Sequence, residues 1–354
     1  MDRQGSQGQA SSSASGGEAG VVGEAKGRHR PRFGVTFDQQ MIVSLIFAAI
    51  FVAFAVFLPG FFTVGNLVTL MRTVAVLGIL GLGMAIVVIG RGIDLSMIAS
   101  LAVPAALVLA LAGKGYGVGG SLACGFGLAV AIGILNGVLV AYVEIPSLFT
   151  TLAVGIGIAG IGQSGLFEYD IIPWPSQLDA IGWIGRGALF GIPYSVLAFV
   201  IVTLGVGIFL RRTRPGLFIY ASGDSPAAAR ITGISVRPMI VFQYVIAAAV
   251  STFAGLVLAA SSNNMDTRIF NLTWIYDVIL VVVLGGIGLS GGRGGVLNVV
   301  VGTLLIGTIV NGMTILNASF EVQNLIKGMV LLAALLLDSI VNPRNEETAQ
   351  QGDI

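Results

Sequence analysis

The chain is built around ten apolar runs, most of them close to the length that a helix needs to cross a membrane. They fall at residues 41–58, 67–89, 97–112, 120–141, 147–162, 193–210, 238–259, 274–288, 296–316 and 322–341. A transmembrane helix takes roughly 20 consecutive apolar residues. The pattern therefore predicts an all-α, polytopic integral membrane protein with about ten transmembrane helices. An even number of spans puts both termini on the same side.

The composition agrees with this class. Hydrophobic residues make up 55% and charged residues 10% of the chain, whereas soluble domains carry roughly 25% charged residues. The 51 glycines suit membrane helices, which approach closely through small residues. The net charge of +1 gives no indication of a nucleic-acid partner. The single cysteine, Cys124, excludes a disulfide framework and is expected to be a small buried residue.

Positive charge predicts the orientation, because cytoplasmic loops of membrane proteins are enriched in Lys and Arg. If the N-terminus is cytoplasmic, the outer loops hold Lys114, Arg186 and Arg268, and Arg72 and Lys327 fall within spans. The inner segments then hold Arg3, Lys26, Arg28, Arg30, Arg32, Arg91, Arg211, Arg212, Arg214, Arg230, Arg237, Arg293 and Arg344. This excess predicts that both termini are cytoplasmic.

This pattern divides the chain into three parts. Residues 1–40 are rich in Gly, Ser, Gln and Ala and contain a basic stretch at 26–32, which predicts a disordered cytoplasmic tail. Residues 41–342 form the transmembrane domain, and residues 343–354 form a cytoplasmic C-terminal tail. The longest inner connection is 211–237. The longest outer one, 163–192, carries two tryptophans and a Pro-Trp-Pro turn, so we expect a structured cap near the lipid headgroups.

The inner connection contains a short helix signature, "GDSPAAARITG", at 223–233. Ser225 suits the N-cap, Pro226 the first helical position, and Gly233 the stop, with three alanines between them. About eight residues cannot hold a helix in water unaided. We therefore expect this helix to insert into a partner, with its small alanine face and Ile231 as the contact surface.

Polar residues within the apolar runs are candidates for a transport path. Arg91 and Asp94 lie beside glycines between the second and third spans, where a broken helix with a charge at its edge is typical of such a path. The alternative is that Asp94 caps the third span at its N-terminus. Further path candidates are Asn66, Asn136, Asp277 and Asn311. Other polar residues, most of them expected to make interhelical hydrogen bonds, are Arg72, Gln163, Gln243, Asn298 and Lys327.

Two passages resemble each other within the chain. "VIGRGIDLS" precedes the third span, and "VLGGIGLS" precedes the ninth. Each joins an inward-running span to an outward-running one in the expected topology. The similarity hints at an internal duplication, and the glycines favour close helix packing and a sharp turn over phosphate binding.

Several kinds of catalytic chemistry have no residues to support them. The sequence contains no G-x-x-x-x-G-K-[ST] motif. Its one histidine, His29, falls in the N-terminal tail. The spacing of Asp94 and Asp277 in the sequence does not support an intramembrane aspartate enzyme. We therefore expect a chain that is not an enzyme and carries no catalytic residue, cofactor or metal of its own.

Over residues 40–342 the chain resembles the permease subunit of ribose-type (monosaccharide) ABC importers. The stretches that carry the resemblance are "GIDLSMIAS" (92–100), "IPSLFTTLAVGIGIAG" (145–160), "GDSPAAARITGISV" (223–236), "VVLGGIGLSGGRGGVLNVVVGTLLIGTIVNG" (282–312) and "IKGMVLLAALLLD" (326–338). The resemblance implies a bacterial inner-membrane subunit that pairs with a second copy or a related permease. It also implies a cytoplasmic ATPase that binds ATP and Mg, and a periplasmic solute-binding protein.

The resemblance also implies a role for the short helix, because a cytoplasmic helix of such permeases docks in a groove of the ATPase. The docking signature is E-A-A-x-x-x-G, and Ala228, Ala229 and Gly233 match it, with Ala227 in place of Glu. The residues expected to couple to the ATPase are Asp224, Ser225, Pro226, Ala227, Ala228, Ala229, Arg230, Ile231, Thr232 and Gly233.

Two departures from the family pattern leave the solute open. The family usually reads G-I-D-L-S-V-G-S, whereas this chain has Met97, Ile98 and Ala99 after the serine. The stretch before Asp277, at 263–277, also replaces the usual small residues. The expected function is ATP-driven import of a sugar or sugar-like solute by alternating access. The alternative is an ion-coupled secondary transporter of a small polar solute, which would use Asp94 or Asp277 for coupling.

Overall fold

The structure is a computed structural model that describes residues 39–167, 169–271 and 274–341. The predicted C-terminal tail, and all but the last two residues of the predicted N-terminal tail, lie outside these residues. Within them, every predicted apolar run forms a helix. The ten helices are α1 (Gln39–Phe57), α2 (Val64–Ile89), α3 (Met97–Gly113), α4 (Val118–Ala141), α5 (Ser147–Ile161), α7 (Tyr194–Arg212), α10 (Val236–Ser262), α11 (Trp274–Leu284), α12 (Val296–Ile315) and α13 (Phe320–Val341).

Seven of the described helices are long and apolar enough to cross a membrane, which makes this a multi-pass membrane protein. They are α1, α2, α4, α5 with the turn that follows it, α7, α10 and α12. The helices α3 and α11 are apolar but shorter. α11 ends at Leu284 and not at the predicted residue 288, because Gly285 and Gly286 terminate it.

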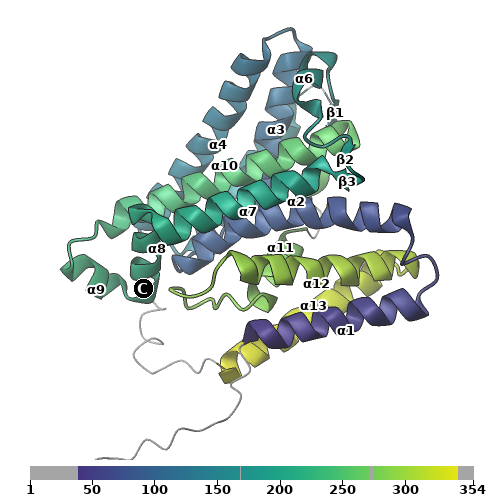
Figure 1. Cartoon of the computed structure of the whole chain (residues 1–354). Helices are drawn as coiled ribbons and strands as arrows, with labels where there is room; N and C mark the ends of the chain where they lie inside the picture. The colour runs from purple at the N-terminus through teal and green to yellow at the C-terminus, as the bar shows by residue number, and fades with distance from the viewer. Residues whose placement is uncertain (1–38, 168, 272–273, 342–354) are drawn as a thin grey trace, which may run out of the picture. The chain divides into compact units, whose positions relative to one another are not determined.

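Helices α2 and α10 form the centre of the described fold (Figure 1). α10 packs on α2, α3 and α4, and α2 also packs on α7, α11 and α12. Every residue of α2 from Val74 to Ile89 is buried, as expected for a helix that is apolar on all sides. Small residues allow the close contacts: Gly133 on α4 lies directly against the backbone of Val245 on α10.

Helix α4 corrects one expectation from the sequence. Its buried stripe contains Ser121, Gly125 and Ala129, spaced one helical turn apart. Cys124 lies off this stripe and is exposed. The prediction that it is buried is wrong, because an apolar helix in a membrane protein can turn one face away from the protein.

The connections predicted to lie on the outer side contain short strands and helices, so they are structured as expected. Strand β1 (Ile171–Pro173) pairs antiparallel with β4 (Asn264–Asp266), so the connection after α5 is joined to the one after α10. Strands β2 (Ala188–Leu189) and β3 (Ile192–Pro193) form a second pair. The remaining short elements are η1 (Gly162–Leu166), η2 (Ser176–Leu178), α6 (Asp179–Gly182) and η3 (Thr267–Asn271). The protein is therefore mostly helical, and the all-α prediction missed these two sheets.

Candidate coupling site

The connection between α7 and α10, which was predicted to be cytoplasmic, holds two helices where the sequence predicted one. Helix α8 (Arg214–Asp224) follows α7 at once, and α9 (Pro226–Ile231) follows α8. The side chain of Thr213 caps α8 by accepting a hydrogen bond from the Gly216 N–H at 3.2 Å. The signal that could have revealed α8 is Thr213-Arg-Pro, an N-cap followed by a proline in the first turn.

Helix α9 has the predicted caps. The Ser225 hydroxyl accepts from the Ala228 N–H at 3.2 Å, and Pro226 occupies the first turn. At the other end, Gly233 adopts a left-handed φ of +83°, and the Ile234 N–H donates to the Ala229 carbonyl at 3.0 Å. A residue with positive φ is the usual end of a helix. The sequence therefore specified this helix at both ends.

The exposed face of α9 is smaller than expected. Ala229 is only 3% exposed, because it packs against the rest of the chain, so the prediction that all three alanines face outward is wrong for this residue. Ala227, Ala228 and Arg230 are exposed. Ile231 is 88% exposed at the helix end, a large apolar side chain that contacts little within this chain.

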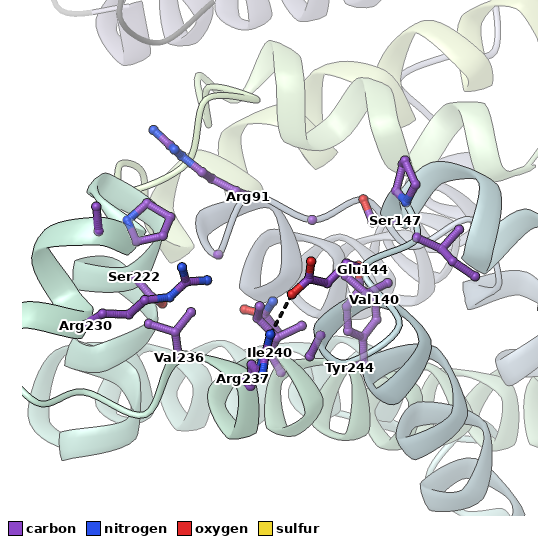
Figure 2. A pocket seen from close by; sticks show the side chains of 18 of the residues that line it. Arg91, Val140, Glu144, Ser147, Ser222, Arg230, Val236, Arg237, Ile240 and Tyr244 are labelled. Atoms are coloured by element: carbon purple, nitrogen blue, oxygen red, sulfur yellow. Dashed lines mark hydrogen bonds and ion pairs between the residues drawn. The ribbon is translucent and has the colours of Figure 1, made fainter. Parts of the chain in front are cut away.

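A cavity of about 680 Å³ lies beside α9. Figure 2 shows Arg230 reaching toward it from one side, with Tyr244 of α10 and Ser147 of α5 on the other. At its rim the Arg237 guanidinium donates to Glu144 Oε1 at 2.6 Å. This pair connects the first turn of α10 to the connection between α4 and α5, and both side chains are more than half exposed.

Arg91 forms another part of the cavity wall (Figure 2). Its Nε–H donates to the Ser290 carbonyl at 2.7 Å, and its NH2 group donates to the Asp224 carbonyl at 3.2 Å. Arg91 was a predicted path residue. Its guanidinium joins the α2–α3 turn to the last residue of α8 and to the turn after α11.

Asp94 and Asn136 belong to one buried polar cluster. Asp94 Oδ1 accepts from the Ser96 N–H at 2.9 Å and from the Ser96 hydroxyl at 2.6 Å. The same hydroxyl accepts from Asn136 Nδ2 at 2.7 Å. Ser96 is the residue before α3, so the carboxylate lies at the N-terminus of that helix. Asp94 Oδ2 and Asn136 Oδ1 are buried and have no hydrogen-bond partner among the described residues.

The connection that contains Asp94 is also joined to α5. The Leu95 N–H donates to the Thr151 hydroxyl at 2.9 Å, and the Ile93 N–H donates to the Ser147 hydroxyl at 3.2 Å. Neither Ser147 nor Thr151 was singled out in the sequence. Both stand one helical turn apart at the start of α5, a spacing that places two hydroxyls on one face.

The other path candidates connect helices in pairs. Asn66 on α2 and Asn311 on α12 exchange two amide hydrogen bonds of 3.0 and 2.8 Å. Asp277 on α11 forms an ion pair with Lys327 on α13, with 2.8 Å between nitrogen and oxygen. Their side chains are 12% and 11% exposed. The structure therefore gives all six path candidates a contact within the chain, and does not bring them to a single cavity.

Among the described residues, no group of three or more His, Cys, Asp or Glu side chains could hold a metal ion. The described residues therefore combine seven apolar helices of membrane-spanning length with a short capped helix between α7 and α10, which defines the class as a multi-pass membrane protein. The model of the family described as the branched-chain amino acid transport system permease component matches residues 66–335.

Curated relatives extend the comparison. The ribose import permease protein of Escherichia coli K12 is 30% identical, over 79% of this chain and 88% of the relative. The Bacillus subtilis ribose import permease protein is 31% identical, over 79% of this chain and 86% of the relative. The Escherichia coli L-arabinose transport system permease protein is also 31% identical, over 86% of this chain and 92% of the relative. The chain belongs to this family of ABC importer permeases, as its resemblance to the ribose-type branch indicated. No solved structure matches the chain.

Proposed function

We propose that this chain is the transmembrane permease subunit of an ABC importer that moves a sugar or sugar-like solute into the cytoplasm. Transport proceeds by alternating access and is driven by ATP hydrolysis in a partner ATPase, which binds ATP and Mg. The observation that carries the proposal is the exposed face of α9, which consists of Ala227, Ala228, Arg230 and Ile231. The names of the curated relatives, which import ribose and arabinose, support a sugar as the solute.

The shape of α9 suits insertion into a groove. Two exposed alanines let the backbone approach the groove wall, Ile231 supplies an apolar anchor, and Arg230 can pair with an acidic wall. Because α9 is joined to α8 through Ser225 alone, and leads into α10 at Val236, movement of the ATPase pair is passed directly to these two helices. α10 packs on α2, α3 and α4, so its movement reaches the centre of the fold.

The proposed topology has ten spans, which are the seven long apolar helices together with α3, α11 and α13. Both termini are cytoplasmic, and the protein lies in the bacterial inner membrane. A reporter enzyme fused after Thr213 should be cytoplasmic, and one fused after Ser176 periplasmic. The reverse result would overturn the orientation, and with it the position of α9 beside an ATPase.

We propose that the periplasmic solute-binding protein docks on the outer layer. The β1–β4 pair holds that layer together, and Asp170, Asp179 and Asp266 give it acidic groups. The Arg268 guanidinium donates to Asp266 and lowers the pKa of its carboxyl, and this ion pair offsets the negative charge of Asp266. A second copy of the chain or a related permease completes the transporter, and the exposed apolar faces of the helices contact that copy and membrane lipid.

We also propose that the six path candidates act through helix packing around the path. Arg91, Asp94 and Asn136 lie at or beside the α2–α3 turn. Through their contacts they control how α3, α4 and α5 pack against one another. Asn66 lies in α2, and Asn311 and Asp277 lie in α12 and α11, which both pack on α2. Movement of α9 would alter these contacts in turn as the path opens.

Ala228→Glu tests the docking of α9, because it puts a bulky charge on the face that enters the groove. The variant should insert into the membrane but lose its ATPase on co-purification, or retain it with uptake uncoupled from hydrolysis. Ser235→Glu is the matched control, since it adds the same charge to the same connection outside α9. Wild-type co-purification and coupled uptake by Ala228→Glu would refute the docking role.

The energy source separates ATP-driven import from ion-coupled transport. Uptake of labelled ribose, or of another sugar found to be imported, should be inhibited by vanadate in membrane vesicles. It should persist when an ionophore collapses the proton and sodium gradients. The opposite pattern would favour the secondary transporter.

A further inference from the structure

The turns that follow α2 and α11 have the same hydrogen-bond pattern. The N–H groups of Gly90, Arg91 and Gly92 donate to carbonyls four, three and five residues earlier. The N–H groups of Gly285, Gly286 and Ile287 do the same, in the same order. This arrangement is a helix cap that requires a left-handed residue at its second position. Helices α3, α9 and α12 end with the same pattern, so the two similar passages share a common form of helix end.

The left-handed position holds different residues in the two turns. Gly286 has φ +90°, and glycine adopts this conformation without steric penalty. In the other turn the position holds Arg91, with φ +68°. A long side chain is unfavourable there, because its Cβ crowds the backbone. Strain of this kind persists where the surrounding contacts hold the residue in place.

Arg91 is held by contacts to two other parts of the chain. Its guanidinium donates to the Ser290 carbonyl, beyond the second turn, and to the Asp224 carbonyl, at the end of α8. A cation is favourable at this second site because the last carbonyls of a helix carry partial negative charge. Asp224 is separated from α9 by Ser225 alone, so the contact lies directly beside the proposed coupling helix.

The backbones around Arg91 are in close contact. The Gly292 N–H donates to the Ile89 carbonyl at 2.8 Å. A Cβ added to Gly223 would overlap the Ile89 carbonyl, and one added to Gly291 would overlap the side chain of Arg91. The two turns and the end of α8 therefore meet without space between them, and a displacement of one is passed to the others.

We propose that Arg91 is a positioning residue that couples movement of α9 to both turns, and so to α2, α3, α11 and α12. This inference rests on the proposed function, because it takes α9 as the helix that the ATPase moves. Through its two hydrogen bonds Arg91 makes the end of α8 and the two turns move together. Without the guanidinium, the ATPase would still hold α9, but its movement would reach these helices less efficiently.

Arg91→Gly is the sharpest test, because it puts into the first turn the residue that the second turn already has. The backbone keeps its cap and loses its strain, so the fold should survive. We expect the variant to co-purify with the ATPase at wild-type yield. Sugar taken up per ATP hydrolysed should fall at least tenfold in proteoliposomes that contain the ATPase and the loaded binding protein. Arg91→Lys keeps the charge and one hydrogen bond, and should give an intermediate ratio.

The outcomes separate the inference from the function on which it rests. A wild-type ratio of uptake to hydrolysis in Arg91→Gly would overturn the coupling role of Arg91 while leaving the importer intact. If Arg91→Gly is not recovered in folded form, Arg91→Lys decides in the same way: a reduced ratio at normal complex yield supports the role, and a wild-type ratio overturns it. Absence of ATP-driven uptake by the wild-type complex would instead overturn the proposed function.

Discussion

The ion pair between Asp277 and Lys327 should make a large contribution to the attachment of α13. Their charged groups are 2.8 Å apart and almost fully buried, and α13 packs mainly on α11 within the described residues. Lys327→Met keeps the length and most of the apolar stem but removes the charge. Asp277 is then left as a buried carboxylate without its partner.

The expected cost can be worked out from the burial. Removing one member of a buried ion pair destabilises a protein by about 3–5 kcal/mol, because the remaining charge is uncompensated. Replacing both members by hydrophobic residues of similar volume is often close to neutral, and an amide in place of the carboxylate likewise leaves no uncompensated charge. The double variant Asp277→Asn/Lys327→Met should therefore be more stable than Lys327→Met alone. We expect it to recover about 2 kcal/mol or more of the loss.

The assay is unfolding of the purified permease in mixed micelles by increasing sodium dodecyl sulfate, followed by tryptophan fluorescence. The wild type, both single variants and the double variant form a complete double-mutant cycle. A coupling energy below about 0.5 kcal/mol would refute the argument, because that value is typical of exposed pairs. The exposed pair Glu144–Arg237 is the matched control, and its own cycle should give such a value.

Two further variants test helix contacts by the same unfolding assay. Asn66→Ala should reduce the free energy of unfolding by about 1–3 kcal/mol, because it leaves the Asn311 amide without its reciprocal partner. If the losses in Asn66→Ala and Asn311→Ala simply add up in the double variant, this reasoning is contradicted. Gly223→Ala should cost about 1–3 kcal/mol by overlap with the Ile89 carbonyl, whereas Gly205→Ala, which meets nothing within 4 Å, should be neutral or slightly stabilising. Equal stability of these two glycine variants would show that the contact at Gly223 is relaxed.

The helices were predictable from the sequence because their signals are local. An apolar run long enough to cross a bilayer has few other stable conformations, since every backbone polar group must be satisfied within the segment. The caps of α9 were equally local, with Ser225 and Gly233 at its two ends. The end of α11 was predicted less well, because an apolar run continues past Gly285 and Gly286 although the helix stops there.

Contacts between distant segments could not be read from the sequence. Nothing near Arg91 indicates that it reaches Asp224, which lies 133 positions later. The pairing of β1 with β4 likewise joins two connections that are separated by the five helices α6 to α10. The choice of buried face also depends on neighbours, and this is why Ala229 and Cys124 were assigned to the wrong side.

The last prediction concerns Asp94, whose contacts allow charge and hydrogen bonding to be separated. Asp94→Asn keeps the oxygen that accepts from Ser96, and replaces only the unpartnered Oδ2 by an amide nitrogen. Asp94→Leu removes the acceptor altogether and leaves two donors of Ser96 without a partner at the start of α3. Each unsatisfied buried group costs about 1–3 kcal/mol.

We therefore expect Asp94→Leu to reduce the yield of folded permease, and Asp94→Asn to retain yield while lowering uptake. The reason for the second effect is that a neutral amide holds Ser96, and through it Asn136, less firmly than a carboxylate does. Complex yield and initial uptake rate, measured side by side in both variants, distinguish the roles. Wild-type uptake together with wild-type yield in Asp94→Asn would show that the charge serves neither packing nor transport, and that the remaining role of Asp94 is to accept hydrogen bonds at the first turn of α3.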